Sequence, residues 1–468
     1  MFQSYEENKK YLEETLGTDK NFDVVSREIE IGERRSVYFF IDGFCKDELL
    51  EKFLQYLMDK KKDDMPSHIS DFAKTGLPYV EIDLEDNLDK VIQNILSGVF
   101  AFIIEGYDKI ILMDSRTYPA RSVSEPEKDK ALRGSKDGFV ETVVFNTALI
   151  RRRIRSTDLC IEMMNAGEQS KTDIAICYMD SRADHKFLSW LKDRISHLHV
   201  DALTLNQESL AECIFPARWY NPFPKFKFTE RPDTAAAQIL EGNIIILVDN
   251  SPSAMILPVS LFDIMEESDD YYFPPITGSY LRLSRALIVF MTYFITPTYL
   301  LLVQYPQWIP NWLKFIAIKE TVNVPIIIQF LLLELAIDGL RLAAVNTPNM
   351  LSTPLSVMAA LVLGEFSVKS GWFNSECMLY MAFVSIANYT QANYEFGYAL
   401  KFFRIISLLT TFFFGWVGYI AGWLFFIIAL INNRMVSGQS YLYPVIPFSW
   451  SKLKDRIIRH RLIYHIKK

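Results

Sequence analysis

Three ionisable residues stand inside the most apolar part of this 468-residue sequence, and they are its strongest candidates for function. Glu334, Asp338 and Arg341 are spaced by four and three residues, so they share one face of an α-helix. Charge is costly in the hydrocarbon of a membrane, so that face must meet protein or water. The spacing leaves three hypotheses open: the lining of an aqueous pore, a coupled-ion site in a transporter, and a structural salt bridge.

Further polar side chains belong to the same predicted helix, residues 324–345, or follow it directly. On the pore hypothesis, carboxylates from several copies of the chain meet around water and attract cations, and the arginine offsets part of their field. On the structural hypothesis, Asp338 and Arg341 pair only with each other. The candidates for an ion pathway are therefore Glu334, Asp338, Arg341, Gln329 and Asn346.

Long apolar runs surround these charges between residues 286 and 433. A run of ~20 apolar residues in a helix crosses a hydrocarbon layer of ~30 Å. The pattern therefore predicts an α-helical polytopic membrane domain. Its candidate segments are Ala286–Val303, Val324–Leu333, Leu342–Gly364, Cys377–Tyr394 and Ile405–Asn433.

Basic residues constrain how these segments cross the membrane. Residues 451–468 carry seven Lys or Arg and one Asp, and Arg282 and Arg285 precede the first apolar run. Both features favour the cytoplasmic side. We therefore expect an even number of spans, with either Ile405–Asn433 folded as two short spans or one middle segment re-entrant.

Two pairs of residues belong to the last apolar run or precede it. Gly418 and Gly422 form a GxxxG pair, which is typical of closely packed membrane helices. Lys401 and Arg404 come just before the run. We expect their long side chains to reach the membrane surface with the charged ends in water.

Residues 1–280 have the composition of a soluble region. The segment Met1–Lys20 is polar and has no apolar core, so we expect no signal peptide and a cytoplasmic location. The five cysteines form no CxxC pair, which favours reduced thiols over disulfides or a zinc site. The net charge of −7 argues against a general nucleic-acid-binding protein.

Alternating and helical periodicities predict two small α/β subdomains in this region. The first has a strand at Ser36–Ile41, helices at Lys46–Asp59 and Leu88–Leu96, and a hairpin over 100–114. The second follows a helix at Gly138–Ile154 and has a strand at Lys171–Met179, a helix at His185–His197, a helix between Pro232 and Gly242, and a hairpin over 243–258. The expected division is 1–120 for the leader and first subdomain, 121–275 for a linker helix and the second subdomain, 276–434 for the helical membrane domain, and 435–468 for a basic cytoplasmic tail.

The helix Gly138–Ile154 ends in consecutive arginines. These form either a basic docking patch or cations that are favoured at a helix C-terminus and have partners on the neighbouring domain. We predict that the helix joins the two α/β subdomains, or neighbouring subunits, and does not bind nucleic acid. The candidates for this assembly role are Arg151, Arg152, Arg153, Glu141 and Asn146.

Common catalytic and cofactor motifs are missing from the sequence. It contains no GxxxxGK[ST] loop, no GxGxxG turn after a strand, no HExxH pair and no GxSxG elbow. We therefore expect no enzymatic activity, no cofactor and no metal site.

Several motifs together resemble one protein family. They are Glu125–Pro126, residues 133–141 (RGSKDGFVE), Asn146 with 149–154 (LIRRRI), Thr229–Asp233 (TERPD) and Asp270–Tyr272. This combination resembles the GerA family of spore germination A subunits over about residues 37–461. Residues 137–142 and 346–353 are more similar to its SpoVAF (stage V sporulation protein AF) branch than to nutrient receptor subunits. Receptor subunits usually have proline at the place of Ser135, and a Pro–Tyr pair at the place of Ser440–Tyr441.

The resemblance implies a multi-pass protein of the spore inner membrane with a cytoplasmic N-terminal region. It also implies a homo-oligomer in the lipid bilayer that conducts monovalent cations in germination, with other germination membrane subunits as partners. A nutrient germinant receptor A subunit, an ion-coupled secondary transporter and a non-conducting scaffold are the alternatives. Transporters often show internal repeats, and none is visible in this sequence.

Overall fold

The computed structural model describes residues 2, 4–44, 47–75, 77, 81–114, 134–215, 220–267, 269–319, 322–347, 357–391 and 393–458. The chain forms two compact units. The α/β unit comprises Met1–Ala217 and Phe226–Pro258, and the helical unit comprises Arg218–Lys225 and Val259–Lys468. The predicted linker lies outside the described residues over 121–133.

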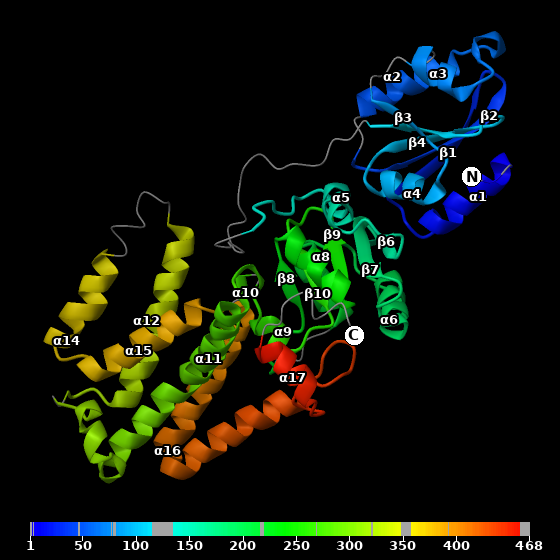
Figure 1. Cartoon of the computed structure of the whole chain (residues 1–468). Coiled ribbons are helices and arrows are strands. Elements are labelled where there is room, and N and C mark those ends of the chain that lie inside the picture. The colour runs from blue at the N-terminus through cyan, green and yellow to red at the C-terminus, as the bar shows by residue number, and fades with distance from the viewer. Residues whose placement is uncertain are drawn as a thin grey trace. The chain divides into compact units, whose positions relative to one another are not determined.

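The first subdomain of the α/β unit is an antiparallel sheet between two layers of helices (Figure 1). Because successive side chains of a strand point to opposite faces, Phe39 packs with one helix layer and Tyr38 with the other. The sheet order is β1 (Val24–Ile31), β2 (Arg34–Ile41), β4 (Phe100–Ile104), β5 (Ile110–Met113) and β3 (Ile82–Glu85). The helices are α1 (Tyr5–Leu16) and α4 (Leu88–Leu96) on one face and α2 (Asp47–Met58) and α3 (Ile69–Thr75) on the other, with the short η1 (Lys62–Asp64) between α2 and α3.

The structure adds two elements that the sequence patterns did not predict in this subdomain. The polar leader forms α1, because Leu12 and Leu16 are four residues apart and both are buried against the sheet. Strand β1 pairs along its whole length with β2 and lies at the edge of the sheet. Its charged residues Arg27, Glu28 and Glu30 obscure the strand signal, and charge on an edge strand discourages pairing with other chains.

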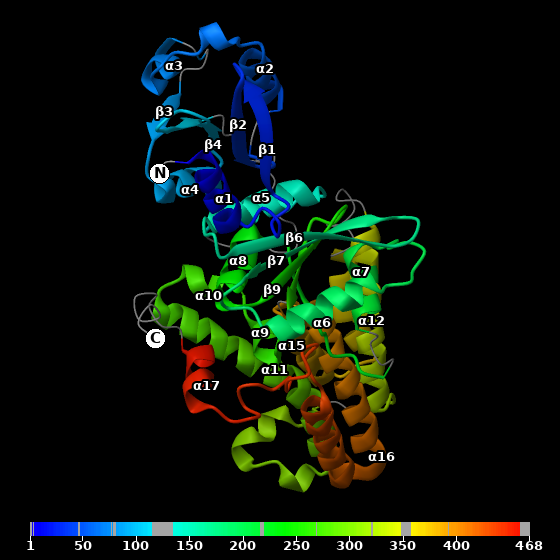
Figure 2. The same cartoon turned by 90° about the vertical axis from the view of Figure 1, so that its right-hand side faces the viewer.

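The second subdomain is also an antiparallel sheet with helices on both faces (Figure 2). The expected strand and helix in 171–197, the hairpin in 243–258 and the helix between Pro232 and Gly242 are all confirmed. Gly242 ends its helix with φ 101°, a conformation that favours glycine. The sheet order is β6 (Leu159–Ala166), β7 (Thr172–Met179), β9 (Ile244–Val248), β10 (Ala254–Leu257) and β8 (Lys227–Thr229). Its helices are α5 (Val143–Arg153), α6 (His185–Ser196), α7 (Gln207–Ile214) and α8 (Pro232–Glu241).

Four longer helices form the body of the helical unit. Among the described residues, α11 and α16 are the two that are long and apolar enough to cross a membrane. The expected run Cys377–Tyr394 forms the 15-residue helix α15, and α12 carries three charges, so further spans remain a prediction. The helices are α11 (Pro275–Gln304), α12 (Ile326–Asn346), α15 (Ser375–Tyr389) and α16 (Tyr394–Asn432). Shorter segments are α9 (Leu261–Met265), α10 (Asp269–Tyr272), η2 (Pro306–Trp308), η3 (Asn311–Ile316), η4 (Ala360–Phe366), α14 (Ser367–Lys369) and α17 (Trp450–Ile457).

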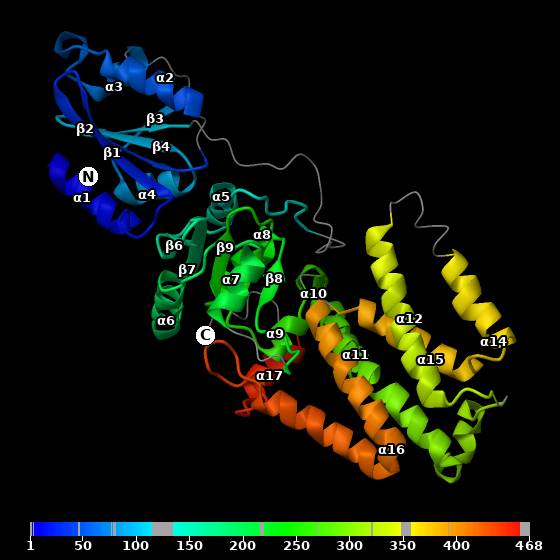
Figure 3. The same ribbon diagram turned by 180° about the vertical axis from the view of Figure 1, so that it is seen from behind.

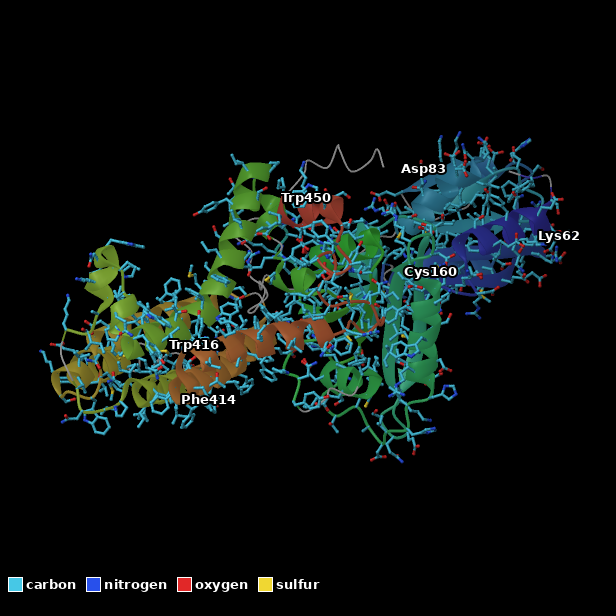
Figure 4. The ribbon with its side chains drawn as sticks, turned by 90° about the horizontal axis from the view of Figure 1, so that it is seen from below. Lys62, Asp83, Cys160, Phe414, Trp416 and Trp450 are labelled. Carbon is cyan, nitrogen blue, oxygen red and sulfur yellow. The ribbon has the colours of Figure 1, made fainter. Side chains whose placement is uncertain are left out.

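Helix α16 consists of two legs that meet at Gly415, where φ is 57° and ψ is −134° (Figure 3). Figure 4 labels Phe414 and Trp416, the residues before and after Gly415 in the sequence. The legs fold back on each other, since the ring of Phe403 lies 5.6 and 5.3 Å from those of Phe425 and Phe426. The long apolar run therefore takes the two-segment form that the sequence left open.

The apex of this hairpin requires glycine, so Gly415→Ala is expected to destabilise the helical unit by about 1–3 kcal/mol. The backbone conformation there is one that residues with a side chain rarely adopt, and an added Cβ would lie 2.4 Å from the Tyr305 hydroxyl. The midpoint of thermal unfolding in detergent measures the effect. Gly339→Ala in α12 is the control, because its added Cβ would meet nothing within 4 Å beyond its chain neighbours and the nearby backbone of its own helix, and alanine favours helix. Equal midpoints for the two variants would contradict the assignment.

Candidate functional site

A buried guanidinium connects three helices at the level of Glu334. Arg404 on α16 donates from Nε to Glu334 Oε1 at 2.9 Å, and its Nη2 contacts the same oxygen. Its Nη1 donates to the carbonyl of Thr292 on α11 at 3.1 Å. Glu334 is 4% exposed and Arg404 is 2% exposed. The pair therefore lies inside the bundle and away from solvent.

The ammonium group of Lys401 extends this pair into a chain of four charges. Lys401 Nζ lies 3.3 Å from Glu334 Oε2 and also contacts Asp338 Oδ2. The prediction that Lys401 and Arg404 reach the membrane surface is therefore wrong. Both point into the bundle, because the carboxylates of α12 offer them short charge-assisted hydrogen bonds there.

Arg341 has aromatic partners and does not pair with Asp338. Its Cζ lies 4.8 Å from the ring centroid of Tyr389 and 5.3 Å from that of Tyr398. Within the described residues, its Nε is buried without a hydrogen-bond acceptor, so cation–π attraction holds the side chain. The Asp338–Arg341 pair assumed by the structural hypothesis is replaced by Asp338–Lys401.

Exposure separates the two carboxylates of this cluster. The Glu334 side chain is enclosed, whereas that of Asp338 is 32% exposed. Beside Asp338, α12 presents the exposed apolar residues Leu335 and Leu342. In a single chain, Glu334 therefore braces the bundle from within, and Asp338 is the carboxylate that can meet water.

The structure separates the other two ion-pathway candidates. Gln329 is fully buried and exchanges two hydrogen bonds with Asn374, at 2.7 and 2.8 Å, which ties α12 to the start of α15. Asn346 lies at the C-terminal end of α12, where its amide donates to the carbonyl of Leu342 at 3.0 Å. Gln329 thus connects two helices inside the unit, whereas the side chain of Asn346 is exposed at the end of α12.

Gly418 and Gly422 lie on the inner side of the second leg of α16. An added Cβ at Gly418 would lie 1.9 Å from the carbonyl oxygen of Thr410, and one at Gly422 would lie 2.8 Å from Ser407 Oγ. The hydroxyl of Tyr293 on α11 donates to the carbonyl of Gly422 at 3.1 Å. These distances are the physical basis for the predicted role of both glycines in helix packing.

Arg151 forms a buried ion pair between the two α/β subdomains. It donates from Nε and Nη2 to the two carboxylate oxygens of Asp23, at 2.9 and 3.1 Å, and from Nη1 to the carbonyl of Leu159 at 3.1 Å. Asp23 comes just before β1 of the first subdomain, and Arg151 belongs to α5 of the second. Both side chains are 1% exposed, so this contact is sealed from water.

Arg152 and Arg153, the next two residues of α5, do not take part in this buried pair. Arg152 is exposed. Arg153 donates to Asp137 at 2.6 and 2.7 Å. Burial opposes ionisation of Asp137, yet the hydrogen bonds from Arg153 and Ser135 hold its pKa below the usual value. The three arginines therefore do not form one basic surface.

Glu141 and Asn146 both form hydrogen bonds that hold the segment before α5 in place. The predicted helix begins only at Val143, since residues 138–142 are not helical and Thr142 has an extended backbone. Asn146 holds this segment by exchanging hydrogen bonds of 2.8 and 2.6 Å with the backbone of Val140. The side chain of Glu141 is exposed, and its carbonyl accepts a 2.7 Å hydrogen bond from the backbone of Asn250.

Sequence reasoning missed the partners of both charged clusters. Lys401, Arg404, Tyr389 and Asp23 were not among the candidates, because no local spacing connects them to α12 or α5. One signal was available: two cations in an apolar region balance two carboxylates there. Within the part of the chain that the structure describes, no group of three or more His, Cys, Asp or Glu side chains is placed to hold a metal ion.

Comparison with known proteins gives consistent matches. Residues 10–468 match the family model of the Bacillus/Clostridium GerA spore germination protein. The chain is 34% identical to stage V sporulation protein AF of Bacillus subtilis (strain 168) over 454 residues, which cover 97% of this chain and 92% of that protein. It is 29% identical to the membrane protein YfkQ of the same strain, over 95% of this chain and 87% of that protein. A crystal structure of the N-terminal domain of the A subunit of the Bacillus megaterium spore germinant receptor GerK3 covers 54% of this chain and 93% of that domain, with 26% identity and a TM-score of 0.41.

Proposed function

Because this chain belongs to the GerA family of spore germination proteins, we propose that it is a subunit of a cation-conducting channel that acts in germination. The family model spans almost the whole chain, which supports a role in germination. The two apolar helices and a relative that is itself a membrane protein support membrane association. We place the protein in the spore inner membrane, with both termini cytoplasmic.

The observation that carries the proposal is the partly exposed carboxylate of Asp338, which lies beside the exposed apolar residues Leu335 and Leu342 of α12. Such a charge is unfavourable against lipid. An axis where several copies of the chain meet around water removes this penalty, and a ring of carboxylates there attracts cations. The proposal therefore includes a homo-oligomer with Asp338 nearest to the conducting path. Lys401, on the buried side of Asp338, offsets part of its negative charge. The Glu334–Arg404 ion pair holds α12 in the bundle.

The proposal extends to partners and topology. The apex at Gly415 returns the chain to the side on which α16 starts, which supports an even number of crossings. The basic tail favours the cytoplasmic side. Other germination membrane subunits are the expected protein partners, and monovalent cations such as K⁺ are the expected permeant ions.

Asp338→Asn is expected to lower the K⁺ over Cl⁻ permeability ratio by roughly fivefold, since about 1 kcal/mol of cation attraction is lost in an aqueous path. The measurement is the reversal potential of the reconstituted full-length protein in a planar bilayer under a KCl gradient. Glu365→Gln is the matched control, because this exposed carboxylate pairs with Lys369 within its own helical segment. An unchanged reversal potential for both Asp338→Asn and Glu334→Gln would sink the pore assignment.

The same recordings separate the alternatives. A channel gives single-channel current steps, whereas a secondary transporter gives a flux that saturates with ion concentration and shows no steps. A nutrient receptor A subunit conducts only when a nutrient and its partner subunits are added. A scaffold gives no current in any of these conditions.

A further inference from the structure

The C-terminal helix α17 is fixed to the beginning of the apolar helix α11. Arg282 on α11 donates from Nη1 to the carbonyls of Asp455 and Arg456 at the end of α17, at 3.4 and 3.1 Å. Arg456 on α17 pairs through Nη1 with Asp263 of α9 and lies 3.3 Å from Glu266, the residue after α9. Polar contacts with α11 and with the end of α9 therefore hold α17 in place.

A buried charge network forms the base of this contact. Arg282 pairs with Glu266 at 2.6 Å, and Arg285 pairs with Asp270 at 2.9 Å and Glu267 at 2.7 Å. The long apolar run of α11 starts immediately after Arg285. Helix α17 therefore lies at the level where α11 changes from charged to apolar, which is the water boundary of a membrane-spanning helix.

The outward side of α17 combines aromatic, aliphatic and basic side chains. Trp450, Lys454 and Ile457 are spaced by four and three residues, so they share one helix face, and all three are exposed. Phe448 precedes the helix, and its ring lies 6.3 Å from that of Trp450. Phe448 and Trp450 are each 67% exposed (Figure 4 labels Trp450).

Lysine supplies the charge of this surface. Lys452 and Lys454 are exposed, and within the described residues neither forms an ion pair. The sequence from 451 to 468 holds seven Lys or Arg and one Asp. Tryptophan, aliphatic side chains and lysines on one short helix are typical of helices that lie in the headgroup layer of a membrane.

We propose that α17, with Phe448, is an interfacial element that binds the anionic headgroups of the membrane in which α11 is embedded. The rings and Ile457 enter the boundary between headgroups and acyl chains, and Lys452 and Lys454 pair with lipid phosphates. A lipid surface fits better than a protein partner, because α17 is held at the end of an apolar helix and its charge opposes that of an anionic leaflet. The inference requires membrane association and is independent of ion conduction.

The test compares full-length protein in nanodiscs of phosphatidylcholine alone with nanodiscs that also contain phosphatidylglycerol. Hydrogen exchange of the peptide covering residues 448–458, followed by mass spectrometry, is the measurement. We expect slower exchange of this peptide with phosphatidylglycerol, with each lysine contributing roughly a fivefold slowing. We expect the double substitution Lys452→Gln/Lys454→Gln to remove the difference between the two lipids. High salt is expected to weaken the protection, because it screens surface charge.

The control is Lys90→Gln/Lys186→Gln, which removes the same charge from exposed positions on α4 and α6 and should leave the lipid difference unchanged. Unchanged exchange in peptides from α16 shows that each variant is folded. Equal exchange in the two lipids overturns the proposal. Protection by inorganic phosphate in phosphatidylcholine nanodiscs also overturns it, because that result indicates a site for a free anion. Protection that arises only when a second membrane protein is present overturns it as well, because that result indicates a protein partner.

Discussion

Glu334→Leu is expected to destabilise the helical unit by about 3–5 kcal/mol, the usual effect of removing one partner from a buried ion pair. The substitution leaves the guanidinium of Arg404 among apolar helices, with the carbonyl of Thr292 as its remaining acceptor from this cluster. Lys401 keeps Asp338 as a partner, so the uncompensated charge is that of Arg404. Thermal unfolding in detergent, followed by circular dichroism, measures the loss.

A second substitution distinguishes a lost ion pair from lost packing. Glu334→Leu/Arg404→Met removes both charges and is expected to recover most of the stability, since apolar side chains often replace a buried ion pair without loss. The matched control is Glu365→Leu, which breaks an exposed pair with Lys369 and should change stability by at most about 1 kcal/mol. If the double variant is less stable than Glu334→Leu, the bracing role of the Glu334–Arg404 pair is wrong.

Asp23→Asn is expected to destabilise the α/β unit by about 3–5 kcal/mol for the same reason. Arg151 would keep its hydrogen bonds to backbone carbonyls but lose the carboxylate that neutralises it. Because the pair joins the two subdomains, the loss should concentrate at their contact. Hydrogen exchange should therefore accelerate in β1 and β6 more than in β9, which lies inside the second sheet.

Arg152→Ala is the control for this second prediction, because it removes an arginine from the same helix at an exposed position. Its effect on stability should stay within about 1 kcal/mol. Uniformly faster exchange throughout both sheets after Asp23→Asn would contradict a role at the contact between the subdomains. The Asp23 and Glu334 substitutions lie in different units of the chain, so their effects should add.

Much of the local structure could be predicted because its causes are local. The apolar residues of Leu88–Leu96 are spaced for one helix face, and the structure has a helix with the same bounds. Pro232 at the start of α8 and Gly242 after its end act through the backbone conformations that these two residues favour. The long apolar run of 405–433 predicted a membrane-type segment and left its fold-back open, because glycine permits a sharp turn without requiring one.

Other features depended on distant parts of the chain. Phe223 comes between segments of the α/β unit in the sequence, yet its ring stacks on Phe403 of the helical unit at 5.2 Å. Strand β1 has a weak pattern of its own, and it is defined by pairing with β2 along its whole length. In both cases the stabilising contact comes from residues that a short sequence window does not contain.

The charged residues of the helical unit show most clearly what the sequence determines and what the tertiary structure determines. Sequence alone was sufficient to place Glu334 and Asp338 on one face of an apolar helix, because helical spacing is a local property. Their partners, Lys401 and Arg404, lie more than 60 residues further along the chain. Any cation near the apolar region has the correct charge for this pairing, so charge alone selects none of them. Only the packing of α11, α12 and α16 brings one guanidinium and one ammonium group to the carboxylates, because the bundle buries Glu334, Lys401 and Arg404 and so makes them pair with one another.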